Sequence, residues 1–129
     1  MKIDEATNFC DNWLRSWRGN DPNCLIEFYS ENAFYRDPAN TAGLKGRTQI
    51  LPYFTKLLAS NPNWKWERVE VFPIDNGFVA KWKATIPVGS EVIVENGLDI
   101  VEIQKGKITR NEVYFDRAKW LEALRITRS

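Results

Sequence analysis

The sequence predicts an α+β domain in which helices come first and a curved antiparallel sheet follows. Apolar residues before position 60 recur at steps of three and four, whereas those after position 63 alternate with a period of two. Two turn sequences, Asp75-Asn76-Gly77 and Lys105-Gly106-Lys107, separate the later segments and indicate hairpins. A sheet that wraps around helices leaves a cone-shaped hollow between the two layers.

Three helices are expected in the first half. The first has its apolar face on Ile3, Ala6, Phe9, Cys10, Trp13, Leu14 and Trp17 and ends by Gly19. Asp21-Pro22 indicates an N-cap followed by proline at the first helical position, so a short helix should run to about Tyr29. The third helix begins at Arg47, with Pro52 in or near its first turn.

Strands are expected around and after the third helix. Ala33–Arg36 is a short strand ended by Asp37-Pro38, and the glycines of Gly43-x-x-Gly46 indicate a turn that leads into the helix. The segments 64–74, 78–86, 92–104 and 107–116 should form a four-stranded antiparallel meander. Asp116 then caps a closing helix that carries Trp120, Leu121 and Leu124.

Composition restricts the possible functions. The 129 residues fit one domain, 1–129, and 18 Lys and Arg against 17 Asp and Glu give no basic run for a nucleic acid. No stretch reaches about 18 apolar residues and the N-terminus is polar, so we expect a cytoplasmic protein without a membrane partner. The lack of histidine excludes His-based triads and the usual zinc sites, and we expect no metal and no cofactor.

The two cysteines do not have the spacing of a metal or redox motif. Cys10 and Cys24 both fall in expected helices, so buried free thiols are a better interpretation than a disulfide.

Two aspartates are the candidate proton carriers. Asp37 lies at the end of a strand, where it either transfers a proton or only closes a turn by accepting backbone N–H groups. Asp99 shares strand parity with Ile93, Val101 and Ile103, so it should face apolar surroundings that favour its neutral form. The alternative for Asp99 is a buried ion pair with Lys or Arg across the sheet.

Aromatic residues from several segments should meet at the hollow. Those expected to line a pocket for a small apolar molecule are Trp13, Trp17, Tyr35, Tyr53, Phe54 and Trp82, together with the inward-facing Asn111, Val113 and Phe115 of the last strand. Glu112 has the opposite parity, with Arg110 and Tyr114, and should lie on a polar outer face or in a dimer interface.

These segments, in this order and spacing, resemble the SnoaL-like family of the NTF2-like superfamily, which also contains the ketosteroid isomerases. The resemblance covers nearly the whole chain through Trp13–Trp17, Phe28–Pro38, Gly46–Phe54, Gly77–Trp82, Gly97–Glu102 and Val113–Asp116. It implies a cone with an internal pocket, usually in a homodimer, that often binds a small apolar ligand. It does not imply one reaction, because the superfamily contains enzymes of several kinds and non-enzymatic binders.

Carried over residue by residue, the resemblance implies that Asp37 moves a proton and that Asp99 stays neutral and donates to an oxyanion. The tyrosine that ketosteroid isomerases carry on the first helix is replaced by Trp13, and an indole donates a hydrogen bond but does not titrate as a phenol does. Val113 stands where limonene-type epoxide hydrolases have an aspartate. Steroid isomerisation in its familiar form and epoxide hydrolysis are therefore not expected.

Two hypotheses follow. In the first, the chain is a cofactor-independent isomerase or cyclase that moves a proton on a small apolar carbonyl compound. In the second, the pocket or the outer face of the sheet binds a small ligand or a partner without turnover, which would fit if Arg36, Lys45 or Arg47 neutralised the carboxylates. We also expect a homodimer formed through the outer sheet face, with Val69 and Val71 among its apolar residues.

Overall fold

The computed structural model describes residues 1–128. Its elements are, in chain order, α1 (Ile3–Ser16), α2 (Pro22–Ile26), β1 (Tyr29–Asp37), β2 (Asn40–Lys45), α3 (Arg47–Ser60), β3 (Lys65–Ile74), β4 (Gly77–Val88), β5 (Glu91–Gln104), β6 (Lys107–Tyr114) and α4 (Ala118–Arg128). The predicted α+β class is confirmed. Among these residues, none of the helices combines the length and the apolar character needed to cross a membrane.

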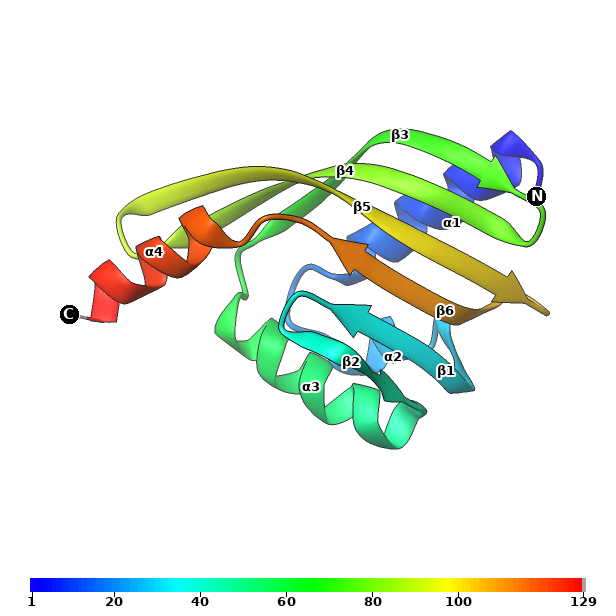
Figure 1. Cartoon of the computed structure of the whole chain (residues 1–129), viewed down its shortest axis with the longest axis horizontal. Coiled ribbons are helices and arrows are strands. Elements are labelled where there is room, and N and C mark those ends of the chain that lie inside the picture. The colour runs from blue at the N-terminus through cyan, green and yellow to red at the C-terminus, as the bar shows by residue number, and fades with distance from the viewer. Residues whose placement is uncertain (129) are drawn as a thin grey trace.

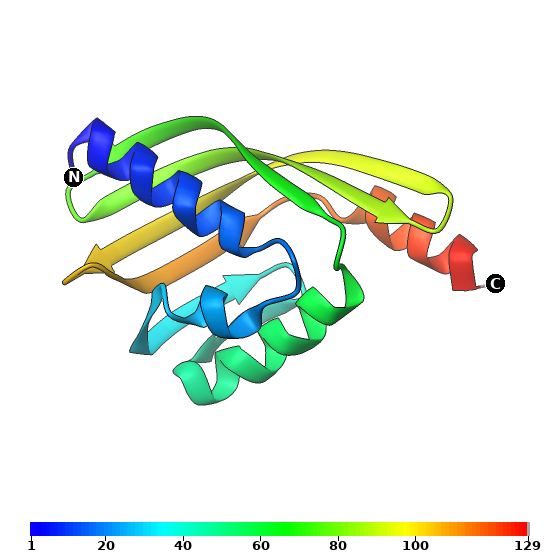
Figure 2. The same cartoon turned by 180° about the vertical axis from the view of Figure 1, so that it is seen from behind.

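The six strands form one curved sheet in the order β2-β1-β6-β5-β4-β3 (Figure 1). The antiparallel meander predicted for the last four strands is confirmed. β1 joins it by parallel pairing with β6, and β2 pairs antiparallel with β1 at the edge. Figure 2 shows α1 lying across the inner side of β3 and β4, with α2 and α3 gathered below β1 and β2. The helices and the inner face of the sheet enclose the core.

The starts of α2 and α4 follow the capping signals in the sequence. The side chain of Asp21 accepts a hydrogen bond of 3.1 Å from the backbone N–H of Cys24, and Pro22 occupies the first position of α2. Oδ1 of Asp116 accepts a bond of 2.9 Å from the backbone N–H of Ala118, so the predicted cap of the closing helix is present. Pro52 lies inside α3 just beyond its first turn, near the position expected.

The strand β2 was not predicted. Gly43 is in its middle with φ +86, and a Cβ there would lie 2.3 Å from the ring of Phe34. This glycine therefore allows the close approach of an aromatic ring to an edge strand, where the sequence suggested only a turn. β1 is also longer than expected, because it begins at Tyr29, where the second helix was predicted to end.

Two burial predictions are wrong. Val71 was expected on the outer face with Val69, but it is buried on the inner face. The reason is a bulge, because the pairing of β3 with β4 shifts between Arg68 and Glu70. Val69 is exposed. Cys24 is free but exposed because it lies on the solvent side of the short α2, whereas Cys10 is free and buried as expected.

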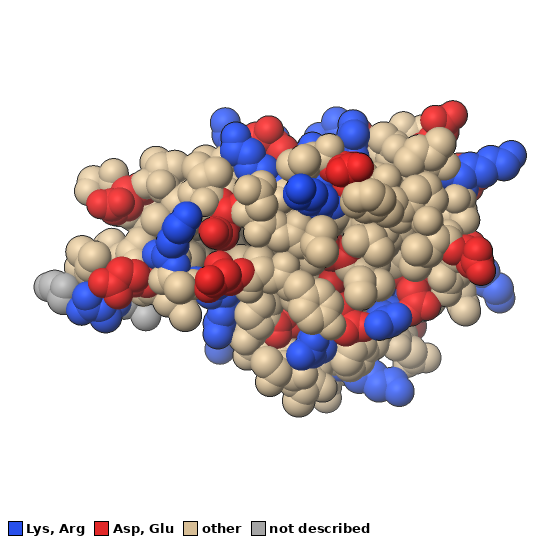
Figure 3. Space-filling view, turned by 45° about the horizontal axis from the view of Figure 1, so that its top comes forward, with Lys and Arg blue, Asp and Glu red and all other residues tan. Residues whose placement is uncertain are grey.

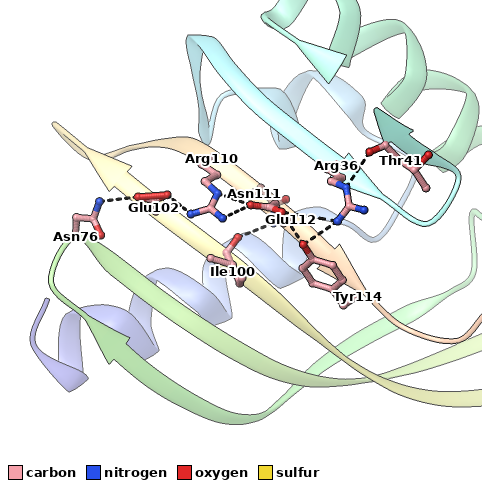
Figure 4. A network of polar contacts seen from close by, with 9 residues as sticks. All are labelled: Arg36, Thr41, Asn76, Ile100, Glu102, Arg110, Asn111, Glu112 and Tyr114. Carbon is pink, nitrogen blue, oxygen red and sulfur yellow. Dashed lines mark hydrogen bonds and ion pairs between the residues drawn. The ribbon is translucent and has the colours of Figure 1, made fainter. Parts of the chain in front are cut away.

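The outer face of the sheet carries a polar network (Figure 4). Arg110 bonds Glu112 and also Glu102, the latter over 2.6 Å, and Tyr114 donates to Oε1 of Glu112 over 2.6 Å. The predicted outward parity of Glu112, Arg110 and Tyr114 is confirmed. In the view of Figure 3, acidic and basic side chains are interspersed over the surface, in line with the near-balanced charge.

Candidate functional site

A cavity of about 280 Å³ lies between the inner face of the sheet and the helices. Its walls are mainly aromatic and aliphatic, and among the described residues only Asp37, Asp99 and Arg117 bring charged groups to it. The described residues that line it are Leu14, Trp17, Tyr35, Asp37, Pro38, Ala39, Tyr53, Leu57, Trp64, Trp66, Trp82, Asp99, Val113, Phe115, Arg117, Trp120, Leu121 and Leu124. The predicted hollow is therefore an apolar pocket with a few converging polar groups, the usual composition of a small-molecule site.

The aromatic wall is built by rings in edge contact. Trp82 packs against Trp66 with ring centroids 4.5 Å apart and against Phe115 at 5.4 Å. Gly97 pairs with Trp82 across β4 and β5, and a Cβ at this glycine would lie 2.5 Å from the indole. Only a glycine at this position lets the indole lie close against strand β5.

The carboxyl group of Asp37 accepts five hydrogen bonds. Oδ1 accepts hydrogen bonds from the backbone N–H groups of Ala39 and Asn40, both at 2.9 Å, and from the side-chain amide of Asn40 at 3.0 Å. Oδ2 accepts hydrogen bonds from the hydroxyls of Tyr35 at 2.7 Å and Tyr53 at 2.6 Å. One oxygen thus closes the β1–β2 turn, as the turn interpretation of Asp-Pro required, while the other faces the tyrosines of the pocket.

Asp99 lies deep in the cavity, with a side chain that is 3% exposed. The indole N–H of Trp82 donates to Oδ1 over 2.7 Å, and Nδ2 of Asn111 donates to Oδ2 over 2.9 Å. Burial raises the pKa of Asp99 from 3.8 to about 7, although both donors oppose this shift; the charge of Asp37 adds to it. The predicted apolar environment of Asp99 is present.

Behind Asp99 runs a buried chain of hydrogen bonds with a fixed direction. Nε1 of Trp13 donates to the hydroxyl of Tyr29 over 3.2 Å, and that hydroxyl donates to Oδ1 of Asn111 over 2.8 Å. Asn111 then donates to Asp99. Because an indole N–H can only donate, Trp13 sets the direction of every bond in the chain.

The predicted pocket residues divide into two groups. Both aspartates line the cavity, as do Trp17, Tyr35, Tyr53, Trp82, Val113 and Phe115. Three others are fully buried behind the wall. Trp13 and Asn111 belong to the chain that supports Asp99, and Phe54 packs edge-on against Trp17 and Tyr35 with ring centroids 5.0 and 5.1 Å apart.

Sequence reasoning missed part of the lining. Trp64 and Trp66 were expected in a strand but not in the pocket, and Arg117, which follows the predicted cap Asp116, was not expected in the pocket either. The closing helix was predicted, but its apolar residues Trp120, Leu121 and Leu124 were not assigned to the cavity they cover. These three residues form the apolar side of a short helix that follows the last inward-facing strand. This pattern was the one feature of the sequence that indicated their place over the cavity.

The basic residues considered as neutralising partners lie elsewhere. Arg36 bonds the carbonyl of Thr41 and the hydroxyl of Tyr114, and Arg47 bonds the carbonyl of Tyr29. Lys45 is exposed at the end of β2, and in the described part of the chain no ion pair includes Lys45, Asp37, Asp99 or Arg117. The ion-pair alternative for Asp99 is therefore wrong.

The fold and the pocket define a cone of the NTF2-like type. The sequence model of the SnoaL-like domain matches residues 10–111, and the chain belongs to this family. A comparison with curated proteins gave no match.

Solved structures confirm the fold. The chain is similar to a protein of ketosteroid isomerase-like fold from Catenulispora acidiphila, in complex with trimethylamine, with 17% identity, coverage of 84% of this chain and 85% of that one, and a TM-score of 0.75. TerC, co-crystallised with polyporic acid, has 12% identity, 93% and 98% coverage and a TM-score of 0.78. A protein from Jannaschia sp. CCS1 assigned as a SnoaL-like polyketide cyclase has 11% identity, 94% and 92% coverage and a TM-score of 0.77.

Proposed function

We propose that this SnoaL-like domain binds a small apolar carbonyl compound in its cavity and moves a proton on it without a cofactor, as an isomerase or cyclase does. The observation that supports this most is that two carboxyl groups from distant segments, Asp37 and Asp99, line one aromatic cavity. The polyporic acid of TerC and the cyclase assignment of the Jannaschia protein agree with a ligand of this class.

The reaction needs few groups. A carboxylate removes a proton from the carbon next to the carbonyl, and the electron pair of that C–H bond moves onto the carbonyl oxygen. Hydrogen-bond donors of the pocket stabilise this oxyanion. The same carboxyl group returns the proton to another carbon while the electron pair moves back, so that no oxidant, reductant or metal is required. Aromatic walls limit water and strengthen these interactions.

The resemblance to ketosteroid isomerases implies one assignment of roles. In it, Asp37 takes the proton and Asp99, in its neutral form, donates to the oxyanion. A pKa of about 7 leaves a substantial part of Asp99 neutral at neutral pH, which such a donor requires.

The proposal can be tested with 2-tetralone, a bicyclic ketone with acidic protons beside its carbonyl. In D2O, the protein should accelerate exchange of these protons for deuterium, followed by proton NMR, above the rate in buffer alone. A matched control is Asp75→Asn, because Asp75 lies exposed in the β3–β4 turn and outside the cavity. Exchange that stays at the buffer rate, for this ketone and for larger polycyclic ketones, would remove the catalytic proposal.

A second function, ligand binding without turnover, is favoured by the environment of Asp37. Its carboxyl group already accepts five hydrogen bonds, three of which hold the turn. In this case 2-tetralone should bind, as seen by calorimetry, but should not exchange its protons. The two experiments together separate the two functions.

We further propose that two copies associate through the outer face of the sheet. Large apolar side chains stand exposed there on three strands, namely Phe72, Val92, Val94, Leu98 and Tyr114. An apolar area of this kind on a sheet face favours isologous pairing. Leu98→Asp should convert a dimer to a monomer in analytical ultracentrifugation, whereas Ile3→Asp on α1 should not; a wild-type monomer would contradict the proposal.

A further inference from the structure

We infer that Asp99, and not Asp37, is the carboxylate that takes the proton from the substrate. This rests on the proposed proton-transfer function and reverses the roles that the resemblance implies. The two carboxyl groups differ in how much of their capacity to accept hydrogen bonds is already used. A carboxylate offers about four lone pairs. Asp37 meets five donors at 2.6 to 3.0 Å, whereas Asp99 meets two, one on each oxygen.

Asp37 cannot easily release one of its donors. The three on Oδ1 belong to the β1–β2 turn, so that losing them opens the backbone there. The two on Oδ2 are phenols that remain protonated: burial raises the pKa of Tyr35 well above 10, and burial followed by the bond to Asp37 raises that of Tyr53. Asp37 is therefore suited to hold the two tyrosines and the turn in place.

Asp99 has the opposite arrangement. Trp82 and Asn111 occupy one lone pair on each of its oxygens, and the carboxyl group lines the cavity. The remaining lone pairs can accept a proton from a bound molecule. The two donors also fix the plane of the carboxyl group, which keeps it aligned for transfer. A pKa near 7 supports this role, since a general base works best when its pKa lies close to the ambient pH.

Among the described residues, three other titratable groups have a charge interaction with Asp99 that affects a pKa. They are Asp37, whose charge raises the pKa of Asp99, and Tyr29 and Cys10, whose own pKa values the charge of Asp99 raises. Burial is the main cause of the raised pKa of both Tyr29 and Cys10, and Cys10 reaches about 12. Tyr29 and Cys10 therefore do not change charge between pH 5 and pH 9, and neither produces a transition in this range.

With Asp99 as the base, a different group must meet the oxygen of the substrate. Arg117 also lines the cavity, and its positive charge acts on the hydroxyl of Tyr53. It forms no ion pair within the described residues, so its guanidinium is available to the oxyanion that forms when Asp99 removes the proton. The electron pair then moves from the C–H bond to an oxygen held near Arg117, while the proton rests on Asp99.

The pH dependence of the wild-type protein distinguishes the two assignments by its sign. Exchange of 2-tetralone protons is measured from pD 5.5 to 8.5, and the rate in buffer alone is subtracted at each point. If ionised Asp99 is the base, the protein-dependent rate should rise about tenfold between one unit below and one unit above its pKa. If neutral Asp99 is the donor to the oxyanion, the rate should fall about tenfold over the same range. A fall, or a flat profile, overturns the inference.

Three variants add a test that does not depend on pH. Asp37→Asn can keep its contacts, because its amide oxygen can accept the turn N–H groups and tyrosine hydroxyls can accept from an amide; it should lower the exchange rate far less than Asp99→Asn does and leave it clearly above the buffer rate. Asp99→Asn should reduce exchange to the buffer rate, and Arg117→Gln should reduce it at least tenfold. Asp99 faces two donors, so an amide there could disturb folding, and the wild-type pH profile then decides.

The outcomes separate this inference from the proposed function. Exchange that never exceeds the buffer rate at any pH rejects proton transfer altogether. Exchange that Asp37→Asn abolishes, or that declines as pH rises through 7, keeps the proposed function and rejects the assignment of Asp99. Binding of 2-tetralone measured by calorimetry for each variant shows whether a lost rate reflects a lost ligand.

Discussion

Asn111 on β6 holds Asp99 on β5 through a bond of 2.9 Å from Nδ2 to Oδ2, although the two residues are diagonal and not direct neighbours in the sheet. The register pairs Asp99 with Val113, whose side chain lines the cavity, and pairs Asn111 with Val101. The diagonal bond thus supports the carboxyl group from the side, while the directly paired position leaves space for a ligand.

The Asn111→Leu variant tests the supporting role of this amide. We expect a loss of about 1–3 kcal/mol in the free energy of unfolding, because the buried hydroxyl of Tyr29 loses its acceptor. The pKa of Asp99 should rise further, since a donor to the charged form is removed. Urea denaturation and carboxyl carbon NMR measure these effects. Asn96→Leu, on the exposed side of β5, is the control, and equal losses for both variants would show that the amide has no special role.

The raised pKa of Asp99 predicts how stability depends on pH. The folded state holds a proton on Asp99 up to about pH 7, whereas the unfolded chain releases it near pH 4, so this contribution to stability is fully present below about pH 4, falls as pH rises and is completely lost above about pH 7. The full difference is on the order of 4 kcal/mol. In urea titrations between pH 5 and 8, the stability of the wild type minus that of Asp99→Asn should fall with pH. A difference that stays constant would show an ordinary pKa for Asp99.

Val113→Phe should block the cavity without removing a polar group. The valine lines the pocket and is 8% exposed, so a larger ring can extend into open space instead of into the packed core. We expect the affinity for 2-tetralone to fall at least about tenfold in calorimetry, because the ligand and the ring compete for the same volume. The matched control is Val92→Phe on the outer face, where binding should not change. Unchanged binding in Val113→Phe would place the ligand elsewhere.

The two thiols should differ in reactivity. Burial, together with the charge of Asp11, raises the pKa of Cys10 to about 12, and its side chain is inaccessible, whereas Cys24 is exposed. Because the thiolate is the reacting species, a disulfide reagent should modify one thiol per native chain quickly and the second only in denaturant. Cys24→Ser should remove the fast phase. Two fast thiols in the native protein would show that α1 opens readily.

Much of the fold was predictable because its signals are local. Alternation in β4 and β5, the two tight turns and the caps at Asp21 and Asp116 each depend on a few neighbouring residues. The edge strand β2 was missed because the reason for Gly43 is a ring from another strand, which no local pattern records. The inward return of Val71 likewise depends on a bulge that simple alternation does not reveal.

The site was predictable in its two aspartates and in most of its rings, because strand parity decides which side chains face inward. The supporting contacts were not. That Trp13 turns away from the cavity to Tyr29, and that two tyrosines from different elements meet on Asp37, follows from the three-dimensional packing. The number of donors on each carboxyl group, on which the assignment of the base depends, cannot be counted along a sequence.

The indole of Trp13 stands at the end of the hydrogen-bond chain that leads away from Asp99, and it determines whether a proton can move along that chain. A hydroxyl or a carboxyl group at that position could receive a proton and pass it to the surface, but the nitrogen of Trp13 has no lone pair to offer. The hydrogen bonds from Trp13 to Asp99 therefore offer no conducting path to the surface, and the proton that we propose for Asp99 would have to leave through the cavity that its carboxyl group lines. We therefore expect solvent to reach this proton only through the cavity, so that a bound ketone slows the entry of deuterium from D2O without abolishing it.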